Sequence, residues 1–385
     1  MTATRIPERI LLGPGPSMLP PGVQAALSKP LVGHMDPTLF PLLEAISARL
    51  REVFQTGNEL TLAVSGTGTA GMEACLDHTL APGDRIVVAS AGYFALRIAE
   101  LARRAGADVV LVESPWGQAV DPADVARALG RSRVRAVAAV QVETSTGVLQ
   151  PLDALARIAH DHGAVCLVDA VASLGGVDLS VDRWGIDVCY SGAQKCLSAP
   201  PGMAPVTVAA SAQGRPHAGR SFYLDLDLLW QYWAPPHAYH HTVPVPLIYA
   251  LDEALREVVE EGLPARVARH RRNAESLWAG LEALGLTLLV PPAIRAPTVT
   301  TVLVPDGVDD AAVRGRLLTD YGIEIAGGLG PLRGRIWRIG LMGHSSQARY
   351  VLLLLAALET ILGDMGMRVP RGAGIDAAER SAPLA

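Results

Sequence analysis

The stretches AVCLVD at residues 164–169 and YSGAQKCLSAPPG at residues 190–202 decide how the rest of the chain is interpreted. The first is a short apolar run that ends in a carboxylate, and the second completes another short apolar run, DVCY. Runs of this length are typical of strands buried on both faces of a sheet. Upstream, similar runs at 60–64, 85–90, 108–113 and 134–140 alternate with helical patterns at about 39–54, 70–80, 94–105, 122–129 and 151–162. This alternation predicts an α/β fold, with a large domain whose mostly parallel sheet is flanked by helices.

The pattern changes after about residue 260. A long helical segment at about 264–284 precedes the apolar stretch PTVTTVLV, a helix near 310–320, the stretches GIEIAG and RIWRIG, and a last helix near 345–363. This order is typical of a smaller α+β domain. We therefore expect a large domain at residues 20–260 and a small domain made of residues 1–19 and 261–366. The tail, residues 367–385, is rich in Arg, Gly, Ala and Pro and is expected to be loosely ordered.

Composition excludes several classes of protein. The 385 residues include 33 Lys and Arg against 38 Asp and Glu, and the net charge of −5 gives no basic face for nucleic acid. The first residues, MTATRIPERI, lack the apolar core of a secretion signal, and the apolar stretch at 351–358 is too short to cross a bilayer. The four cysteines have no metal-binding spacing, and His240 and His241 have no third ligand pattern beside them. We expect a cytoplasmic protein that binds no metal, nucleic acid or membrane.

Lysine is almost absent from the chain. Of the 33 basic residues only Lys29 and Lys195 are lysines, and the other 31 are arginines. A guanidinium keeps its proton in a protein, whereas an ammonium can lose its proton and become a nucleophile. A lysine in such a chain is therefore a candidate for chemistry that arginine cannot perform. Lys29 lies in the loop-like stretch SKPLVG and is interpreted as an ordinary surface residue, so the candidate is Lys195.

The segment SGTGTAG (65–71) has the spacing G-x-G-x-x-G between a predicted strand and a predicted helix. A dinucleotide site would also need an acidic residue about 20 positions further on, at the end of the next strand. That strand ends in Ser90 instead. Thr67, Gly68 and Thr69 still place N–H groups and hydroxyls at a helix N-terminus, which is typical of an anion site. On this motif alone, a plain glycine-rich turn remains the alternative.

Asp169 and Lys195 stand 26 positions apart (195 − 169), each after a predicted strand. A carboxylate at the end of a buried strand is costly unless a cation meets it. A protonated pyridine nitrogen would be such a cation, and it would keep the ring an electron sink. The pair could then hold one flat aromatic cofactor, with the carboxylate at its ring nitrogen and the amine at its aldehyde. Taken singly, Asp169 could equally be a helix N-cap or part of a structural ion pair, and Lys195 a surface residue.

Longer motifs, in order along nearly the whole chain, resemble those of the class V aminotransferases, which are pyridoxal 5′-phosphate (PLP) enzymes of fold type I. The resemblance is closest to the alanine–glyoxylate, serine–pyruvate and serine–glyoxylate aminotransferases. The motifs are LLGPGPS (11–17), VFQTGN (53–58), SGTGTAGMEA (65–74), TSTGVLQPL (144–152), LVDAVASLGG (167–176), SGAQKCLSAPPG (191–202), YHHT (239–242), GGLG (327–330) and RIGLMG (338–343). This resemblance implies a PLP-dependent transferase fold of type I and an aminotransferase activity.

The resemblance also implies a role for each matched residue. Lys195 would form a Schiff base with PLP and Asp169 would pair with the ring nitrogen, both as catalytic residues. The other implied cofactor-binding residues are Thr67, Gly68, Thr69 and Gln194 at the phosphate, Phe94 and Val171 on the two ring faces, Thr144 near the phenolic oxygen, and Tyr239 and Thr242 at the phosphate of a neighbouring subunit. Arg338 would bind the substrate carboxylate as a fork, and His34 would help to shape the side-chain pocket. These roles imply a homodimer with active sites at its interface.

Two departures leave the amino donor open. Residues 92–97, GYFALR, replace the commoner G-x-[FW]-G-x-R, and His34 lies in a segment that varies among subgroups. We expect ping-pong transfer from a small amino acid, with alanine or serine favoured, to a small 2-oxo acid, glyoxylate or pyruvate. The alternatives are another donor, such as ureidoglycine, aspartate or a pathway-specific amine, or a lyase of the cysteine desulfurase type. That lyase would need a mobile, reactive cysteine near the substrate. A binding protein that kept the fold is a further alternative, which the intact lysine, aspartate and arginine disfavour.

Overall fold

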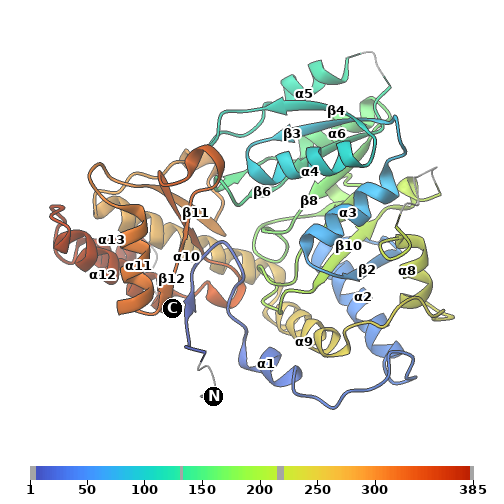
Figure 1. Ribbon diagram of the computed structural model, residues 1–385, viewed down its shortest axis with the longest axis horizontal. Helices are drawn as coiled ribbons and strands as arrows, with labels where there is room; N and C mark the ends of the chain where they lie inside the picture. The colour runs from blue at the N-terminus through green and yellow to red at the C-terminus, as the bar shows by residue number, and fades with distance from the viewer. Residues whose placement is uncertain (1–5, 131–132, 215–220, 382–385) are drawn as a thin grey trace.

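The central sheet has seven strands, in the spatial order β2-β10-β9-β8-β5-β3-β4 (Figure 1). The structure is a computed structural model, and it describes residues 6–130, 133–214 and 221–381. The strands are β2 (Leu60–Ser65), β3 (Arg85–Ser90), β4 (Asp108–Glu113), β5 (Ala136–Val140), β8 (Val165–Asp169), β9 (Val188–Tyr190) and β10 (Met203–Val208). The pairs from β9 through β8, β5 and β3 to β4 are parallel, whereas β10 is antiparallel to β2 and β9. The predicted mostly parallel sheet is confirmed.

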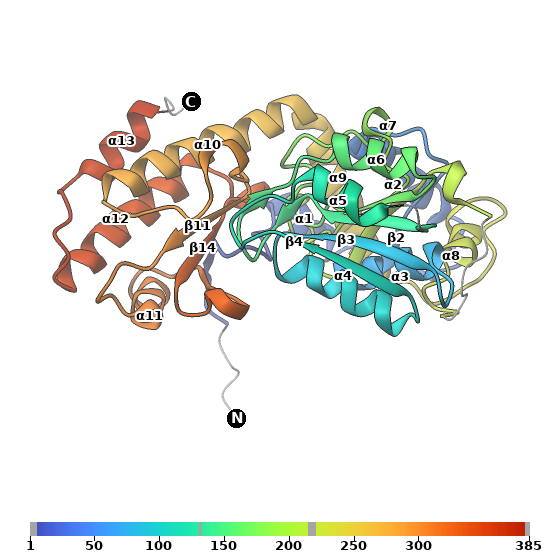
Figure 2. The ribbon, with the colours of Figure 1, turned by 90° about the horizontal axis from the view of Figure 1, so that it is seen from above.

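Helices cover both faces of this sheet (Figure 2). The helices α3 (Gly68–Thr79) and α4 (Tyr93–Arg104) lie on one face, and α2 (Phe40–Phe54), α5 (Pro122–Leu129), α6 (Asp153–Asp161) and α9 (Val245–Glu261) lie on the other. The shorter helices are α1 (Pro21–Ala26), α7 (Val181–Trp184) and α8 (Leu226–Trp233). Because parallel strands need crossover connections, each helix returns the chain to the same edge of the sheet. The carboxyl ends of all these strands except the antiparallel β10 therefore lie at the same end of the sheet, where ligands bind in folds of this kind.

A second unit is formed by the chain after α9 together with residues 10–11 near the N-terminus. It contains the antiparallel strands β11 (Val299–Leu303), β14 (Ile336–Gly340) and β13 (Ala326–Gly327), and the parallel pair of β1 (Ile10–Leu11) with β12 (Ile323–Glu324). The helices α10 (Leu263–Ala283), α11 (Asp310–Asp320) and α12 (Ala348–Asp364) pack around a hydrophobic core that is separate from the large one. A separate antiparallel hairpin of β6 (Val142–Glu143) and β7 (Val148–Leu149) lies between β5 and α6 in the chain. Figure 2 shows α10 extending from the larger unit into the smaller one.

The tail differs from its expected loose order. Residues Ala373–Ser381 form helix α13, which lies along α10 (Figure 2). The Oγ of Ser276 donates a hydrogen bond of 2.9 Å to the carbonyl oxygen of Ala378, which is buried. A Cβ at Gly374 would lie 2.9 Å from the side chain of Leu284. The small residues that suggested disorder instead allow the two helices to pack closely. Residues 382–385 of the tail lie outside the described residues.

Nothing in the described helices combines the length and the apolar character that crossing a membrane requires.

Candidate active site

A cavity opens beyond the carboxyl ends of β2, β5 and β8. It encloses about 540 Å³ of space not filled by atoms, including its open mouth, a size typical of sites for small molecules. Nine of the residues predicted to bind the cofactor line it: Thr67, Gly68, Thr69, Phe94, Thr144, Asp169, Val171, Gln194 and Lys195. Five further lining residues had no predicted role: Met72, Arg97, Val140, Val142 and Ala172. The structure thus brings residues from five separate chain segments to one site.

Lys195 lies in the loop between β9 and β10, and its amine points at the segment GPGPS. The Nζ atom donates a hydrogen bond to the carbonyl oxygen of Pro14. Gly15 has a φ of +111°, and any Cβ there would collide with the Lys195 amine, so only glycine fits this position. Burial, helped by the nearby Arg338 and opposed by Cys196 and Asp169, lowers the pKa of Lys195 to about 8. The amine is therefore neutral far more often than that of an exposed lysine.

Asp169 is the last residue of β8 and is only 3% exposed. Its Oδ1 accepts a hydrogen bond of 2.8 Å from the Val171 N–H, and its Oδ2 accepts one of 2.9 Å from the Tyr190 hydroxyl. Burial raises the pKa of Asp169 to about 6, against the effect of these two donors. No Lys, Arg or His in the described part of the chain forms an ion pair with it. A buried carboxylate of this kind is suited to an incoming cation.

The N-terminus of α3 forms the opposite wall of the cavity. Thr67 is the N-cap of this 12-residue helix, and its side chain makes no capping hydrogen bond. A Cβ at Gly68 would lie 2.9 Å from Cγ2 of Val171, so a larger residue would press on the cavity wall. The Oε1 of Gln194 is buried without a hydrogen-bond partner in the structure. Free donors at a helix N-terminus are typical of phosphate sites.

Phe94 is held in the first turn of α4 by Glu143, a buried residue to which the sequence assigned no role. The Glu143 Oε2 accepts hydrogen bonds from the backbone N–H groups of Phe94, at 3.0 Å, and Ala95, at 3.2 Å. The guanidinium of Arg97 lies 4.9 Å from the centre of the Phe94 ring, and its Nη1 donates to Oγ1 of Thr69 at 3.2 Å. Arg97 is three residues after Phe94 and so shares its helix face, which is the signal that could have revealed it.

Arg338 lies on β14 and reaches the site from the smaller unit. Its Nε donates to the carbonyl oxygen of Gly327 at 2.7 Å, and its Nη1 donates to that of Thr144 at 3.0 Å. The residue is 7% exposed, and burial lowers the pKa of its guanidinium to about 10, with Glu143 opposing this shift. Within the described residues, no carboxylate forms an ion pair with it. A buried guanidinium that has N–H groups beyond those used in these two hydrogen bonds is suited to binding a carboxylate.

Four predicted residues are not among those that line this cavity: Arg338, which contacts the lining residue Thr144, and Tyr239, Thr242 and His34. Tyr239 is 63% exposed, Thr242 is exposed as well, and the ring of His34 lies 5.4 Å from that of Tyr239. These last three residues share a surface region instead. A contribution from them to a cavity would have to come from another copy of the chain.

The residues present fit PLP on structural grounds. The cavity offers an amine at Lys195, a buried carboxylate at Asp169 that forms no ion pair with any other described residue, and N–H donors at the start of α3. An aldehyde, a protonated ring nitrogen and a phosphate need these three groups, respectively.

Comparison with known proteins agrees with this geometry. The family model described as Aminotransferase class-V matches residues 24–332. The (S)-ureidoglycine–glyoxylate transaminase of Bacillus subtilis is 39% identical over 97% of this chain and 95% of that protein. The alanine–glyoxylate aminotransferase of Oryctolagus cuniculus is 41% identical over 92% of this chain and 93% of that protein. The crystal structure of an alanine–glyoxylate aminotransferase from Nostoc sp. has a TM-score of 0.92 at 45% identity, and covers 94% of this chain and 97% of that one. The chain therefore belongs to the class V aminotransferases of fold type I and is a PLP-dependent enzyme that transfers amino groups.

Proposed function

We propose that this enzyme transfers the amino group of a small amino acid, alanine or serine in preference, to glyoxylate or pyruvate by a ping-pong mechanism. The observation that carries the proposal is Arg338, a buried guanidinium without a carboxylate partner among the described residues, next to a cavity that contains Lys195. Amino acids and 2-oxo acids share the carboxylate that such a group would bind. The Bacillus subtilis and Oryctolagus cuniculus relatives are both named for glyoxylate, which supports glyoxylate as the acceptor.

Each of the chain's own groups then has a defined task. When bound, PLP supplies a ring that withdraws electrons from the substrate's α carbon. Arg338 would orient the substrate by its carboxylate, and the neutral amine of Lys195 would take the proton from the α carbon as a general base. Asp169 would hold a proton at the ring nitrogen. Phe94 and Val171 would pack against the two faces of the ring and hold it in place.

A donor screen tests this proposal. The purified, PLP-loaded protein is mixed with one amino acid at a time and no acceptor, and the 2-oxo acid formed is measured by mass spectrometry. We expect alanine or serine to give about one product per active site, because a ping-pong enzyme stops after its first half-reaction. Adding glyoxylate should then release glycine. If only aspartate, ureidoglycine or another amine reacts, the proposed donor is wrong although the enzyme class stands.

Arg97 provides a further prediction. We expect Arg97→Gln to weaken PLP binding by about 10- to 100-fold, because a hydrogen bond to a charged group contributes about 1.5–3 kcal/mol. Fluorescence titration of the cofactor-free protein with PLP would measure the dissociation constant. Arg104→Gln is the control, since this arginine of the same helix is exposed and forms its ion pair with Glu100 on the surface. Equal affinities for the two variants would contradict a role of Arg97 at the phosphate.

The cysteine desulfurase alternative is disfavoured by the cysteines. All four are buried and unpaired, and Cys196, the one next to Lys195, is 1% exposed. Burial raises the pKa of the Cys196 thiol to about 12, so the reactive thiolate is scarce at neutral pH. The solved structure of a cysteine desulfurase from Thermococcus onnurineus is 17% identical to this chain, a likeness that shows the fold alone. Sulfide release from cysteine would revive this alternative.

Unpaired thiols also support the proposal that the enzyme works in the reducing cytoplasm.

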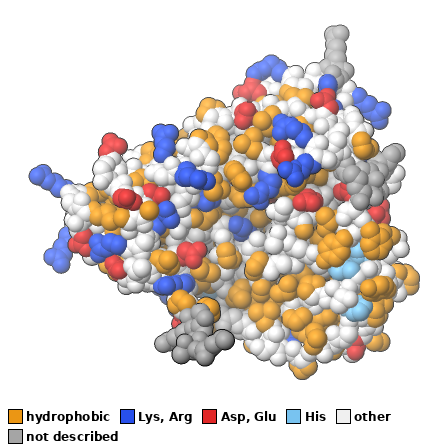
Figure 3. Space-filling view, in the orientation of Figure 1, with side chains coloured by type: hydrophobic (Ala, Val, Ile, Leu, Met, Phe, Trp, Pro, Cys, Tyr) orange, Lys and Arg blue, Asp and Glu red, His pale blue; other side chains and the backbone are white. Residues whose placement is uncertain are grey.

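A homodimer is the assembly that the surface supports. Figure 3 shows hydrophobic side chains gathered with histidines on the side of the molecule where α8 lies. Large apolar residues are exposed here, with Phe222 at 67% and Tyr239 at 63%, and the ring of His240 stacks on Phe222 at 4.7 Å. Exposed apolar patches of this kind mark protein interfaces. Tyr239 and Thr242 would then reach the phosphate site of a partner subunit, and a solution mass of twice 40.5 kDa is expected.

A further inference from the structure

The backbone of the loop that carries Lys195 is held by hydrogen bonds from residues distant in sequence. Three successive carbonyl oxygens of this loop accept hydrogen bonds from outside it. Those of Gln194 and Lys195 accept from Ser17, whose backbone N–H bonds the first at 2.9 Å and whose Oγ bonds the second at 2.8 Å. That of Cys196 accepts from Nη2 of Arg266 at 2.6 Å. The loop's position therefore depends on groups that do not touch the cavity.

Arg266 connects two of the segments that hold catalytic residues. It lies in the first turn of α10 and is only 6% exposed. Besides the Cys196 carbonyl, its Nε donates to the carbonyl oxygen of Gly175 at 3.0 Å, in the turn that follows Asp169. Its remaining nitrogen, Nη1, pairs with Glu261 at the end of α9. One guanidinium thus joins the segment after Asp169 to the segment after Lys195.

Arg269 makes the corresponding contacts for the smaller unit. It pairs with the same Glu261, and its Nη1 donates to the carbonyl oxygens of Gly343, at 3.0 Å, and Ser346, at 2.6 Å. These two residues belong to the turn that follows β14, the strand of Arg338. Nδ2 of Asn273 also donates to the Ser346 carbonyl, at 2.9 Å. Arg269 therefore holds the segment that comes after the carboxylate-binding arginine.

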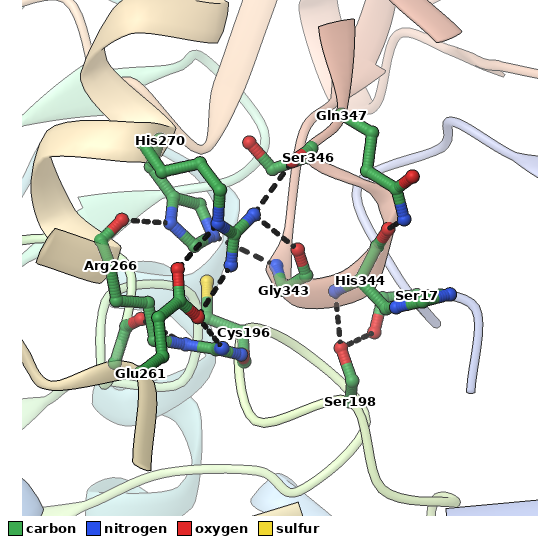
Figure 4. Close-up of polar contacts among 12 residues, drawn as sticks. Ser17, Cys196, Ser198, Glu261, Arg266, His270, Gly343, His344, Ser346 and Gln347 are labelled. Carbon is green, nitrogen blue, oxygen red and sulfur yellow. Dashed lines mark hydrogen bonds and ion pairs between the residues drawn. The ribbon is translucent and has the colours of Figure 1, made fainter. Parts of the chain in front are cut away.

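The contacts of Arg266 and those of Arg269 form two arms, and a neutral histidine connects them. The Nδ1 of His270 donates to the carbonyl oxygen of Arg266 at 2.8 Å, and its Nε2 accepts the N–H of Gly343 at 2.9 Å. Burial, together with the charges of the nearby arginines, lowers the pKa of His270 to about 3, so the ring can accept this hydrogen bond at any physiological pH. In Figure 4 these groups form one continuous set of contacts between α10, the lysine loop and residues 343–347.

We propose that Glu261, Arg266 and Arg269, which we call the α10 clasp, are positioning residues that set the place of Lys195 and Asp169 relative to Arg338. The proposal rests on the function proposed above for these three residues. A partly buried ion cluster of this kind is a weak source of net stability, because desolvation offsets the attraction between its charges. The fixed geometry of the cluster is the better explanation, since the two arginines end on backbone carbonyls of the segments that follow the catalytic residues.

Substitutions in the Arg266 arm and in the Arg269 arm are expected to change different kinetic parameters. In Arg266→Lys the charge opposite Glu261 remains, but one ammonium cannot reproduce the fork that spans Gly175 and Cys196. Since small displacements of reacting groups can cost up to about 10²-fold in rate, we expect kcat to fall by about 10- to 100-fold with little change in KM. The circular dichroism of the bound cofactor should change as well. In Arg269→Lys we expect KM to rise about 10-fold for both the amino donor and the 2-oxo acid, with kcat and the dichroism close to wild type.

Controls separate this result from general damage. Arg272→Lys, an exposed position on the same helix, should behave as wild type. Ser17→Ala and Asn273→Ala each remove a neutral contact from one arm, so they repeat the test in milder form if a clasp variant does not fold. Equal shifts of kcat and KM in the two arms, or wild-type values in both, would overturn the clasp.

Failure of the clasp is distinguishable from failure of the proposed function. Borohydride reduction of the wild-type holoenzyme should fix a pyridoxyl group on Lys195, which peptide mass mapping would locate. If wild type is labelled there but the two arms do not differ, only the clasp is wrong. If wild type is not labelled at Lys195, the proposed function fails first.

Discussion

Replacing Lys195 with arginine is expected to abolish turnover. An arginine keeps its proton in a protein, so it can neither bond covalently to an aldehyde nor take a proton from the substrate. General acid–base catalysis alone contributes up to about 10⁴-fold, and we expect kcat/KM to fall by at least this factor. The longer side chain would also press on Pro14 and Gly15, which already contact the lysine amine. Initial-rate measurements with the donor found in the screen would give the loss directly.

The composition of the chain supplies a matched control. Lys29 is the only other lysine, it is exposed, and its amine lies 5.9 Å from the centre of the Tyr249 ring. Lys29→Arg should leave turnover and borohydride labelling unchanged, since an arginine can take the same place over an aromatic ring. Near-normal turnover in Lys195→Arg would mean that the amine of this residue takes no part in the reaction.

The parts of the fold that sequence predicted are those whose signal is local. β3, β4 and β8 are continuous apolar runs, and their observed bounds agree with the predicted ones within one residue. β10 gives a weaker signal, because Pro205 lies within it and proline is normally excluded from central strands. Helix α13 was mistaken for a loose tail because the contact of its small residues with α10 is visible only in three dimensions.

The same distinction applies to the site. Lys195, Asp169 and the Thr67 turn each follow a strand, and the sheet topology alone brings them together. From the sequence, Tyr190 could be predicted only to be the last residue of a buried strand. Its hydroxyl meets Asp169 because β8 and β9 pair in a register that places these two residues side by side. Arg266 was one of 31 arginines, and its role depends on contacts with residues 70 and 91 positions away.

Replacing Asp169 with asparagine is the second change with a large expected effect. The amide keeps nearly the same shape but has no negative charge to hold a proton at the ring nitrogen. Removing a single aligned electrostatic contact from an active site costs about 10²–10³-fold, and we expect turnover to fall by this factor. Steady-state rates at saturating PLP would measure the loss, with Asp161→Asn, an exposed residue at the end of α6, as the control.

Stability should change in the opposite direction when PLP is absent. Burial raises the pKa of Asp169 from 3.8 to about 6, and each pKa unit corresponds to about 1.36 kcal/mol. Because the folded protein binds this proton more tightly than the unfolded chain does, stability falls as pH rises from about 4 to about 6, by about 3 kcal/mol in all. Asparagine has no such penalty. Cofactor-free Asp169→Asn should therefore unfold at a higher temperature than cofactor-free wild type at pH 8, with a smaller difference at pH 5.

PLP should reverse this order, because a protonated ring nitrogen would compensate the buried charge of wild type and not the amide of the variant. Thermal unfolding with and without PLP at the two pH values provides the comparison. A cofactor-free variant that is less stable than wild type at pH 8 would show that Asp169 serves mainly to anchor Val171 and Tyr190 through its hydrogen bonds. A variant that is more stable without PLP and less active with it would show that this carboxylate is kept for the cofactor, at a cost to the stability of the empty protein.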